Sequence, residues 1–83
     1  MQMQNMQFRD AVDALGGCAT RAEIAQALGA SFYSVKQALL PSDSSAHRPP
    51  PPGWQTALAR LTRKRARQLT KLADRLEAEA DRA

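Results

Sequence analysis

The sequence is poor in the residues that build disulfides, metal centres and membrane spans. It holds one cysteine and one histidine among 83 residues, so no internal disulfide can form, and a metal site would need more nitrogen or sulfur ligands. No apolar run approaches the roughly 20 residues that cross a bilayer, which argues against a membrane partner. The opening residues MQMQNMQ lack the charged and apolar regions of a signal peptide, and we expect a cytoplasmic location.

Groups that perform catalysis are also missing. No paired carboxylates stand in an apolar setting, no glycine-rich phosphate loop is present, and Cys18 and His47 have no supporting motif. We therefore expect no enzyme activity, no cofactor and no small-molecule substrate. We interpret Cys18 as a small apolar residue near the core and His47 as an exposed loop residue.

Positive charge is concentrated in the last third of the chain. The net charge is +4 and the pI is near 10.0, a balance that favours a polyanionic partner. Up to Gly53 the basic and acidic residues are equal in number, so the whole excess follows Gly53. A chain of this length supports one small domain whose core alone is marginal, and we expect a partner to add stability.

The stretch from Arg21 to Leu40, RAEIAQALGASFYSVKQALL, has the residue spacing of a helix-turn-helix. Thr20 and Glu23 form a capping-box pattern that starts a helix near Arg21. Gly29 accepts the left-handed backbone conformation that ends such a helix. The side chains expected to face inward from this stretch are Ile24, Ala25, Leu28, Val35, Ala38 and Leu39.

A second helix is predicted after this turn and another before the first. Ser31 can cap the second helix, and Pro41 stops it. The preceding helix is predicted from an apolar stripe at helical spacing, which ends at Gly16 and Gly17 and consists of Phe8, Ala11, Val12 and Leu15. We expect this helix to pack across the other two.

The stretch resembles the helix-turn-helix of the lambdoid phage repressors and of the wider Xre-like regulator family. The resemblance covers about a quarter of the chain and rests on Ala22-Glu23-Ile24-Ala25-Gln26, Gly29, Ser34-Val35 and Gln37. It implies that the start of the second helix reads base edges in the major groove. The residues that would read bases are Ser31, Phe32, Tyr33, Lys36 and Gln37. The chain is also similar in size and helix-turn-helix content to small autoregulators that accompany anti-CRISPR genes.

Residues 41–53, PSDSSAHRPPPPG, show no periodicity. Their four consecutive prolines favour an extended, semi-rigid polyproline segment, so we interpret the stretch as a spacer. A docking motif for an aromatic-lined groove of a partner is the functional alternative.

One long helix is predicted from Trp54 to about Ala80, because the stretch contains neither glycine nor proline and is rich in helix-forming residues. Its apolar side chains lie on one side, and Arg65 divides them into two groups. We expect the first group to pack on the core; it consists of Trp54, Leu58 and Leu61. We expect the second group to meet a second copy, because an exposed leucine row otherwise has no partner; it consists of Leu69, Leu72 and Leu76.

Along this helix a basic block precedes an acidic block. The side chains expected to contact phosphates are Arg21, Arg60, Arg63, Lys64 and Arg67, and a solvated helix face is the plainer alternative for the basic block. Antiparallel pairing of two copies would oppose unlike blocks. Exposed ion pairs contribute only about 0.3 kcal/mol each, so packing must decide the orientation.

Together these features predict an all-α protein in three parts. Residues 1–40 would form a minimal three-helix DNA-binding domain, residues 41–53 a linker, and residues 54–83 a dimerisation helix. The function predicted is a dimeric regulator, most simply a repressor, that binds a palindromic operator in double-stranded DNA. Two other classes stay open: a phage assembly component such as a terminase small subunit, and an antitoxin or adaptor whose partner binds the Leu69 to Leu76 row.

Overall fold

The computed structural model describes residues 7–82, which contain four α-helices and one short 3₁₀ turn. They are α1 (Phe8–Leu15), η1 (Gly16–Cys18), α2 (Arg21–Leu28), α3 (Phe32–Leu39) and α4 (Trp54–Arg82). No strand occurs within residues 7–82, so the predicted all-α class and the long C-terminal helix are confirmed. The first six residues of the predicted segment 1–40, and the last residue of 54–83, lie outside the described residues. None of the described helices has the length and apolar character needed to cross a membrane.

The helix boundaries around α2 and α3 follow the capping chemistry that the sequence predicts. Thr20 Oγ1 accepts a hydrogen bond from the Glu23 backbone N–H (3.1 Å), and Glu23 Oε1 accepts one from the Thr20 N–H (3.0 Å). Gly29 ends α2 in the left-handed region at φ 65°. Ser31 Oγ then accepts from the Ser34 N–H (3.0 Å) and caps α3. The chain therefore turns between α2 and α3 over only three residues, 29–31.

One hydrophobic core joins α1, α2, α3 and the beginning of α4. Its most deeply buried side chains are Ile24 of α2 and Val35 of α3, each 1% exposed. Leu58 of α4 is buried beside them, and the ring of Trp54 meets that of Phe8 edge-on with centroids 5.2 Å apart. The prediction that the first apolar group of α4 packs on the helices before it is thus confirmed.

Cys18 lies at the surface, so the prediction that it packs near the core is wrong. A 3₁₀ turn inserted after α1 carries Cys18 outward. The backbone becomes extended at Ala19 (φ −147°, ψ 136°), and the Ala19 methyl group takes the buried place instead.

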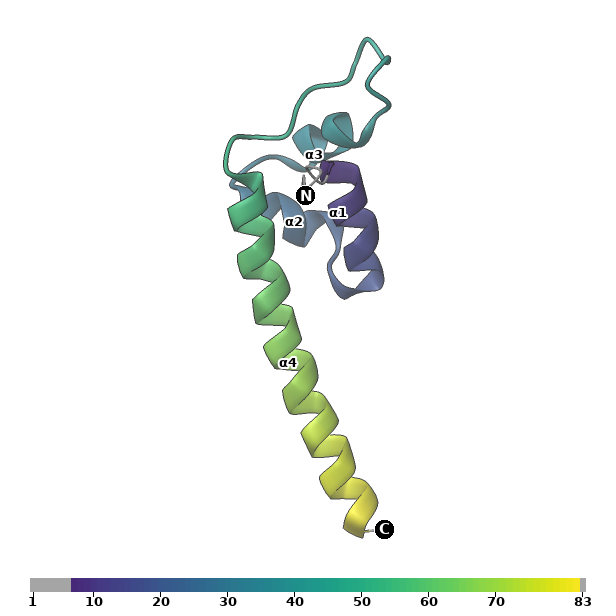
Figure 1. Cartoon of the computed structure of the whole chain (residues 1–83), viewed down its shortest axis with the longest axis vertical. Helices are drawn as coiled ribbons and strands as arrows, with labels where there is room; N and C mark the ends of the chain where they lie inside the picture. Colours follow the sequence, from purple (N-terminus) through teal and green to yellow (C-terminus); the bar gives the residue numbers. More distant parts are fainter. Residues whose placement is uncertain (1–6, 83) are drawn as a thin grey trace, which may run out of the picture.

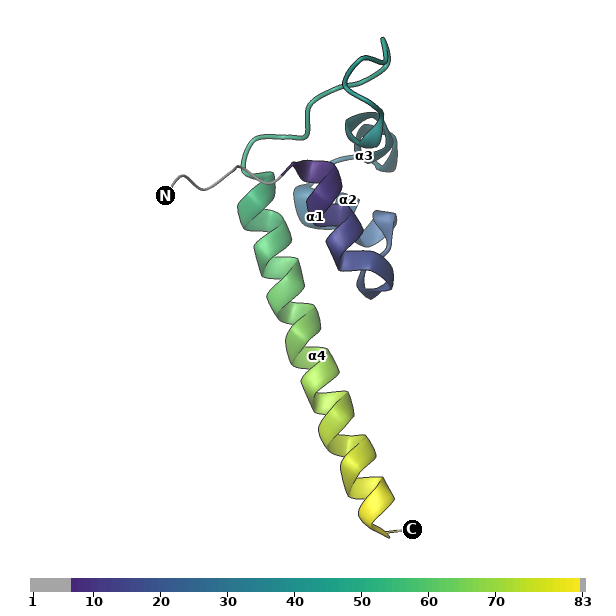
Figure 2. The ribbon, with the colours of Figure 1, turned by 45° about the vertical axis from the view of Figure 1, so that its right-hand side comes forward.

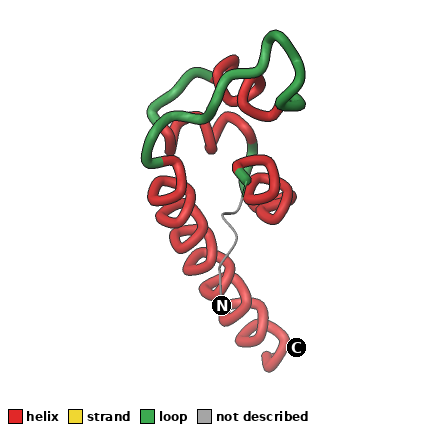
Figure 3. The backbone as a smooth tube through the Cα atoms, turned by 45° about the horizontal axis from the view of Figure 1, so that its top comes forward, coloured by secondary structure: helices red, strands yellow, loops and turns green. Residues whose placement is uncertain are grey.

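The connection between α3 and α4 folds back along α3 before it extends (Figure 3). The backbone N–H of His47 donates to Ser44 O (3.1 Å), and that of Arg48 donates to Gln37 O in α3 (3.3 Å). The His47 ring is half-buried, with Nδ1 2.9 Å from the carbonyl oxygen of Leu40. His47 is therefore a loop residue as predicted, but it is half-buried and not exposed, because its ring contacts the end of α3.

The second half of α4 projects away from the core (Figures 1 and 2). The described residues have a radius of gyration of 16.2 Å and extents of 56 × 36 × 19 Å. A compact domain of this length would have a radius of gyration of about 12 Å. Every residue from 66 to 82 is exposed. The chain therefore carries more than four turns of helix that its own core does not cover.

Candidate nucleic-acid interface

α3 presents two chemically distinct faces. Val35 and Ala38 anchor one face in the core. The opposite face begins with Phe32 and Tyr33, which are 49% and 66% exposed although both are large aromatic side chains. Lys36 stands one turn further along the same face and is also exposed. The helix is thus fixed to the core on one side and offers an aromatic and cationic surface on the other.

The polar residues predicted to read bases differ in how free their side chains are. The Ser31 hydroxyl is already engaged, because it caps α3 and lies 2.9 Å from the Ser34 hydroxyl. Gln37 is half-buried, and its backbone oxygen accepts hydrogen bonds from Leu40 and Arg48. These contacts use the Gln37 backbone, so the side-chain amide keeps its hydrogen-bonding capacity. α3 contains no acidic residue that would repel phosphate.

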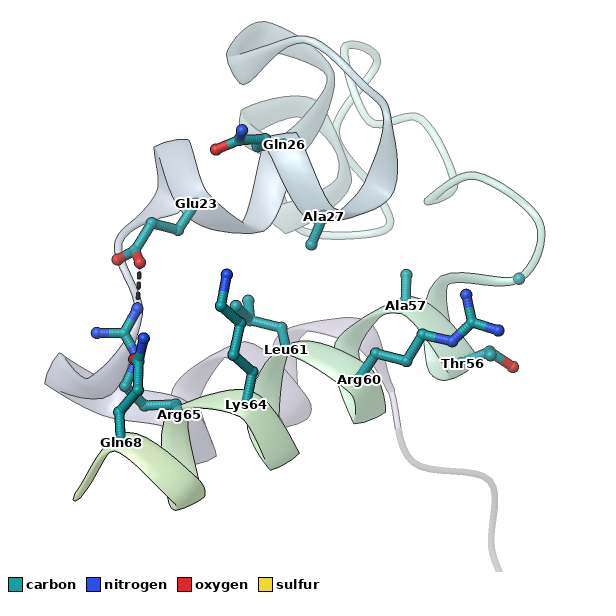
Figure 4. A pocket seen from close by; sticks show the side chains of 11 residues that line it. Glu23, Gln26, Ala27, Thr56, Ala57, Arg60, Leu61, Lys64, Arg65 and Gln68 are labelled. Carbon is teal, nitrogen blue, oxygen red and sulfur yellow. Dashed lines mark hydrogen bonds and ion pairs between the residues drawn. The ribbon is translucent and has the colours of Figure 1, made fainter. Parts of the chain in front are cut away.

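A groove of about 520 Å³ separates α2 from α4 and is bordered by positive charge (Figure 4). Gln26 and Ala27 of α2 form one wall, and Arg60 and Lys64 of α4 form the other. In Figure 4 the amino group of Lys64 points from α4 toward α2, between the two walls. The groove therefore gathers two of the cations that the sequence marks as phosphate contacts.

The other predicted phosphate contacts do not line this groove. Arg63 and Arg67 are exposed on α4 outside the set of groove residues. Arg21 is exposed at the first position of α2. The predicted basic set is therefore spread over more than one surface. α2 packs against both α3 and α4, whereas α3 and α4 share no extensive contact within the described residues.

Sequence reasoning missed an ion pair at the end of this groove. Arg65 of α4 donates from Nη2 to Glu23 Oε2 of α2, across 42 positions of sequence. The hydrogen bond from the Thr20 backbone, followed by the one from Arg65, lowers the pKa of Glu23 below its ordinary value. In the sequence Arg65 interrupts the apolar side of the helix, and this interruption is the signal for the pair, since a charge on a buried face needs a partner.

The Glu23–Arg65 pair also shapes the charge of the groove. Glu23 is the only acidic residue among the groove residues, and Arg65 neutralises it. Arg60 and Lys64 have no ion-pair partner within residues 7–82. The groove consequently keeps a net positive charge of about two, which suits an anionic ligand.

The three leucines predicted to meet a second copy are all exposed. Leu69, Leu72 and Leu76 are 48%, 51% and 55% exposed, and they stand on the projecting half of α4. Isolated exposed leucines are ordinary, but a row of three on one helix face forms a contiguous apolar patch.

Residues 7–82 hold no group of three or more histidine, cysteine, aspartate or glutamate side chains placed to bind a metal ion. Comparisons with protein-family models, with curated proteins and with solved structures found no match to this chain.

Proposed function

We propose that this protein is a sequence-specific DNA-binding regulator that acts as a dimer on a palindromic operator. The observation that carries the proposal is the exposed face of α3. Two aromatic side chains and a lysine face solvent at the start of a helix that is capped and firmly anchored on its other face. Such a surface matches the chemistry of a DNA groove, where base methyl groups, base acceptors and phosphates lie side by side.

The arrangement of α2 and α3 supports insertion of α3 into the major groove. α2, the three-residue turn at Gly29 and α3 follow each other as in a helix-turn-helix, and α1 packs on both α3 and α4. In helix-turn-helix proteins the second helix of the pair enters the major groove while the first crosses the phosphate backbone. By the resemblance to lambdoid and Xre-like regulators, α3 is the reading helix.

Each residue of the reading face has a distinct chemical role in this proposal. Gln37 would pair its amide with adenine, and Lys36 would donate to guanine acceptors. Phe32 and Tyr33 would contact thymine methyl groups, and Ser31 would stand closest to the duplex at the start of α3. Contacts with thymine methyl groups are apolar and need no hydrogen-bonding group, so the aromatic rings at the start of α3 can make them.

Phosphate contacts would come from α2 and α4. Arg21 is exposed at the first position of α2, at the end of that helix opposite to the turn that leads into α3. Arg60 and Lys64 line the α2–α4 groove, and Arg63 and Arg67 extend the positive charge along α4. Because phosphate contacts carry no sequence information, these residues would position the protein on any duplex and α3 would choose the site.

Pairing through α4 would supply the second reading helix. Burying each of Leu69, Leu72 and Leu76 is favourable by roughly 1.5 to 3 kcal/mol. Two copies of α3 related by two-fold symmetry would read two half-sites of a palindrome, and a dimer covering a promoter would exclude polymerase. We therefore propose that the protein is a repressor, and that it acts in the cytoplasm.

Selection of bound sites from a random pool of duplex DNA tests the proposal. We expect a two-fold symmetric consensus, because a symmetric dimer reads the two strands alike. No enrichment of any sequence would overturn the proposal. Ring-sized oligomers with that result would favour a phage assembly component, and a monomer without DNA affinity would favour an adaptor or antitoxin.

The variant Gln37→Ala tests the reading face directly. We expect it to lose about 1 to 3 kcal/mol of binding energy on the selected site and to accept any base at one position. Gln7→Ala, at an exposed glutamine just before α1, is the matched control and should bind normally. An unchanged site preference in Gln37→Ala would remove Gln37 from the reading set.

A further inference from the structure

A second groove, of about 400 Å³, opens between α1 and the first turns of α4. α1 contributes Ala11, Ala14 and Leu15, and α4 contributes Leu58, Ala59 and Thr62. No charged side chain lines it. The groove is therefore an apolar surface distinct from the basic α2–α4 groove, and the proposed contacts with DNA leave it unused.

The α4 wall of this groove continues as a stripe along the projecting half of the helix. From Ala59 the stripe advances by alternating steps of three and four residues, which keeps its members on one face. The members after Ala59 are Thr62, Ala66, Leu69, Ala73, Leu76 and Ala80, and Leu72 lies at the edge of the stripe between Leu69 and Leu76. Every stripe residue from position 66 onward is exposed. Each leucine has alanines as its neighbours on the stripe, so another helix could approach closely.

We infer that a second copy of this chain lies antiparallel along this stripe and seats the C-terminal end of its α4 in the α1–α4 groove. The inference rests on the proposed pairing through α4 and adds the direction of that pairing and the role of the groove. By two-fold symmetry each copy fills the groove of the other. Each α4 would then be covered along most of its length.

An antiparallel register places large side chains on small ones. When Leu69 lies opposite Ala73 of the second copy, Leu76 falls opposite Ala66 of the second copy. Symmetry repeats both contacts, so four leucine-on-alanine layers form around the two-fold axis. In the parallel alternative each residue meets its own counterpart, so that leucines face leucines and alanines face alanines, leaving gaps at the alanine layers.

The same register brings the end of the second helix to the groove. Ala80 of the second copy falls opposite Thr62, which lines the groove together with Leu15 and Leu58. The small alanine side chain fits beside α1. Because no charged side chain lines the groove, docking there buries no unpaired charge of the groove walls.

Charge along the edge of the stripe favours the antiparallel direction. Arg63 lies beside the stripe in the first half of α4, and Glu77 and Asp81 lie beside it in the last two turns. In the antiparallel register Arg63 falls between Glu77 and Asp81 of the second copy, so in this dimer Arg63 pairs with carboxylates and the phosphate contacts of α4 are left to Arg60, Lys64 and Arg67. In a parallel pair in register, the basic first half of one α4 would lie along the basic first half of the other, and the acidic last turns would lie along each other, which is unfavourable.

Disulfide trapping tests the direction. The exposed Cys18 is first replaced (Cys18→Ser), and Thr62→Cys and Ala80→Cys are introduced together and singly. We expect the double variant to form a covalent dimer on mild oxidation and neither single variant to do so. The two cysteines of one chain are about 27 Å apart along α4, too far for a bond within the chain.

Each other outcome of the trapping experiment contradicts the inference in a different way. Covalent dimers from the single variants would show a parallel pair, which overturns the direction and leaves dimerisation standing. A dimer in sedimentation without trapping in any variant would place the interface elsewhere. A monomer would overturn α4 pairing altogether, while site selection from random DNA would still test sequence-specific recognition by α3 independently.

A charge placed in the groove tests its occupancy. Ala14 is exposed on α1 and lines the groove, so Ala14→Glu should leave the fold intact. We expect it to weaken the dimer roughly tenfold, because the carboxylate would lose water where the second copy docks. Ala22→Glu, at an exposed alanine of α2 outside the groove, is the matched control and should not change the dissociation constant. Equal dissociation constants for both variants and the parent would overturn the role of the groove.

Discussion

Leu58 and Leu72 stand on the same side of α4, fourteen residues apart, yet Leu58 is 4% exposed and Leu72 is 51% exposed. The helix around each is equally regular, and the difference lies in what packs against it. α1 and α2 cover the first turns of α4, whereas nothing in residues 7–82 covers the last turns.

An amphipathic pattern therefore identifies the face of a helix that can be buried, but it does not determine which segment or chain packs on that face. Charge distinguishes the two halves as well. Arg60 and Lys64 border a groove against α2, while the acidic residues that follow position 73 stand in solvent. The first half of α4 thus belongs to the core and the candidate DNA surface, and the second half is available for a second copy.

The largest expected effect is on stability, and it separates the two leucines. Leu58→Ala should lower the free energy of unfolding by about 2 to 5 kcal/mol, because it removes packing from the shared core. Leu72→Ala, studied at concentrations where the protein is monomeric, should change it by about 0.5 kcal/mol or less. Urea titrations of the two variants measure the difference. Equal losses would show that the two halves of α4 do not differ as described.

A second prediction concerns the charge of the two halves. Replacing both Arg60 and Lys64 by alanine should weaken binding to all DNA sequences alike. If both contact phosphate, the log-log salt slope should flatten by roughly 0.9 for each lost contact. The control carries Arg75→Ala and Arg82→Ala on the projecting half and should keep the parent slope. A flattened slope in the control alone would place the phosphate contacts on the projecting half of α4 and contradict the prediction.

The smallest expected effect is a pH dependence at the junction of α2 and α4. The Thr20 backbone and Arg65 lower the pKa of Glu23 in the folded protein, so the charged carboxylate stabilises the fold above its ordinary pKa of 4.5. That contribution is lost as the pH falls through the lowered pKa of Glu23.

Glu23→Gln tests this pH dependence because glutamine can keep the capping bond without the charge. We expect the variant to be less stable than the parent at pH 7, and the difference to shrink as the pH falls below 4.5. Thermal unfolding across the pH range measures it. A difference that stays constant from pH 7 to pH 3 would mean that the Glu23 charge contributes nothing.

The parts of the fold that the sequence predicts are those set by local chemistry. Thr20 with Glu23, Gly29 and Ser31 fix the ends of α2 and α3 through bonds to residues at most four positions away. The exposed face of α3 likewise follows from helical periodicity. These features need no knowledge of how distant segments meet.

The features that sequence reasoning missed depend on distant contacts or on small backbone shifts. The Glu23–Arg65 pair joins two helices, and the grooves beside α4 exist only once α1 and α2 have docked on it. Cys18 is exposed and the neighbouring Ala19 is buried because a 3₁₀ turn follows α1. The segment around His47 folds back onto the end of α3 through the contact of the His47 ring with Leu40 and the hydrogen bond from Arg48 to Gln37, which no local pattern predicts.

Sedimentation equilibrium of the parent protein and of the double variant Leu72→Glu with Leu76→Glu tests whether the projecting half of α4 makes the dimer. We expect a dimeric parent and a monomeric variant, because two carboxylates cannot be buried in the leucine row. The variant should keep its helical circular dichroism signal, since both side chains are exposed in the single chain. It should also lose far more affinity for the selected operator than for random DNA. A variant that stays dimeric and binds the operator like the parent would contradict the role assigned to the projecting half of α4.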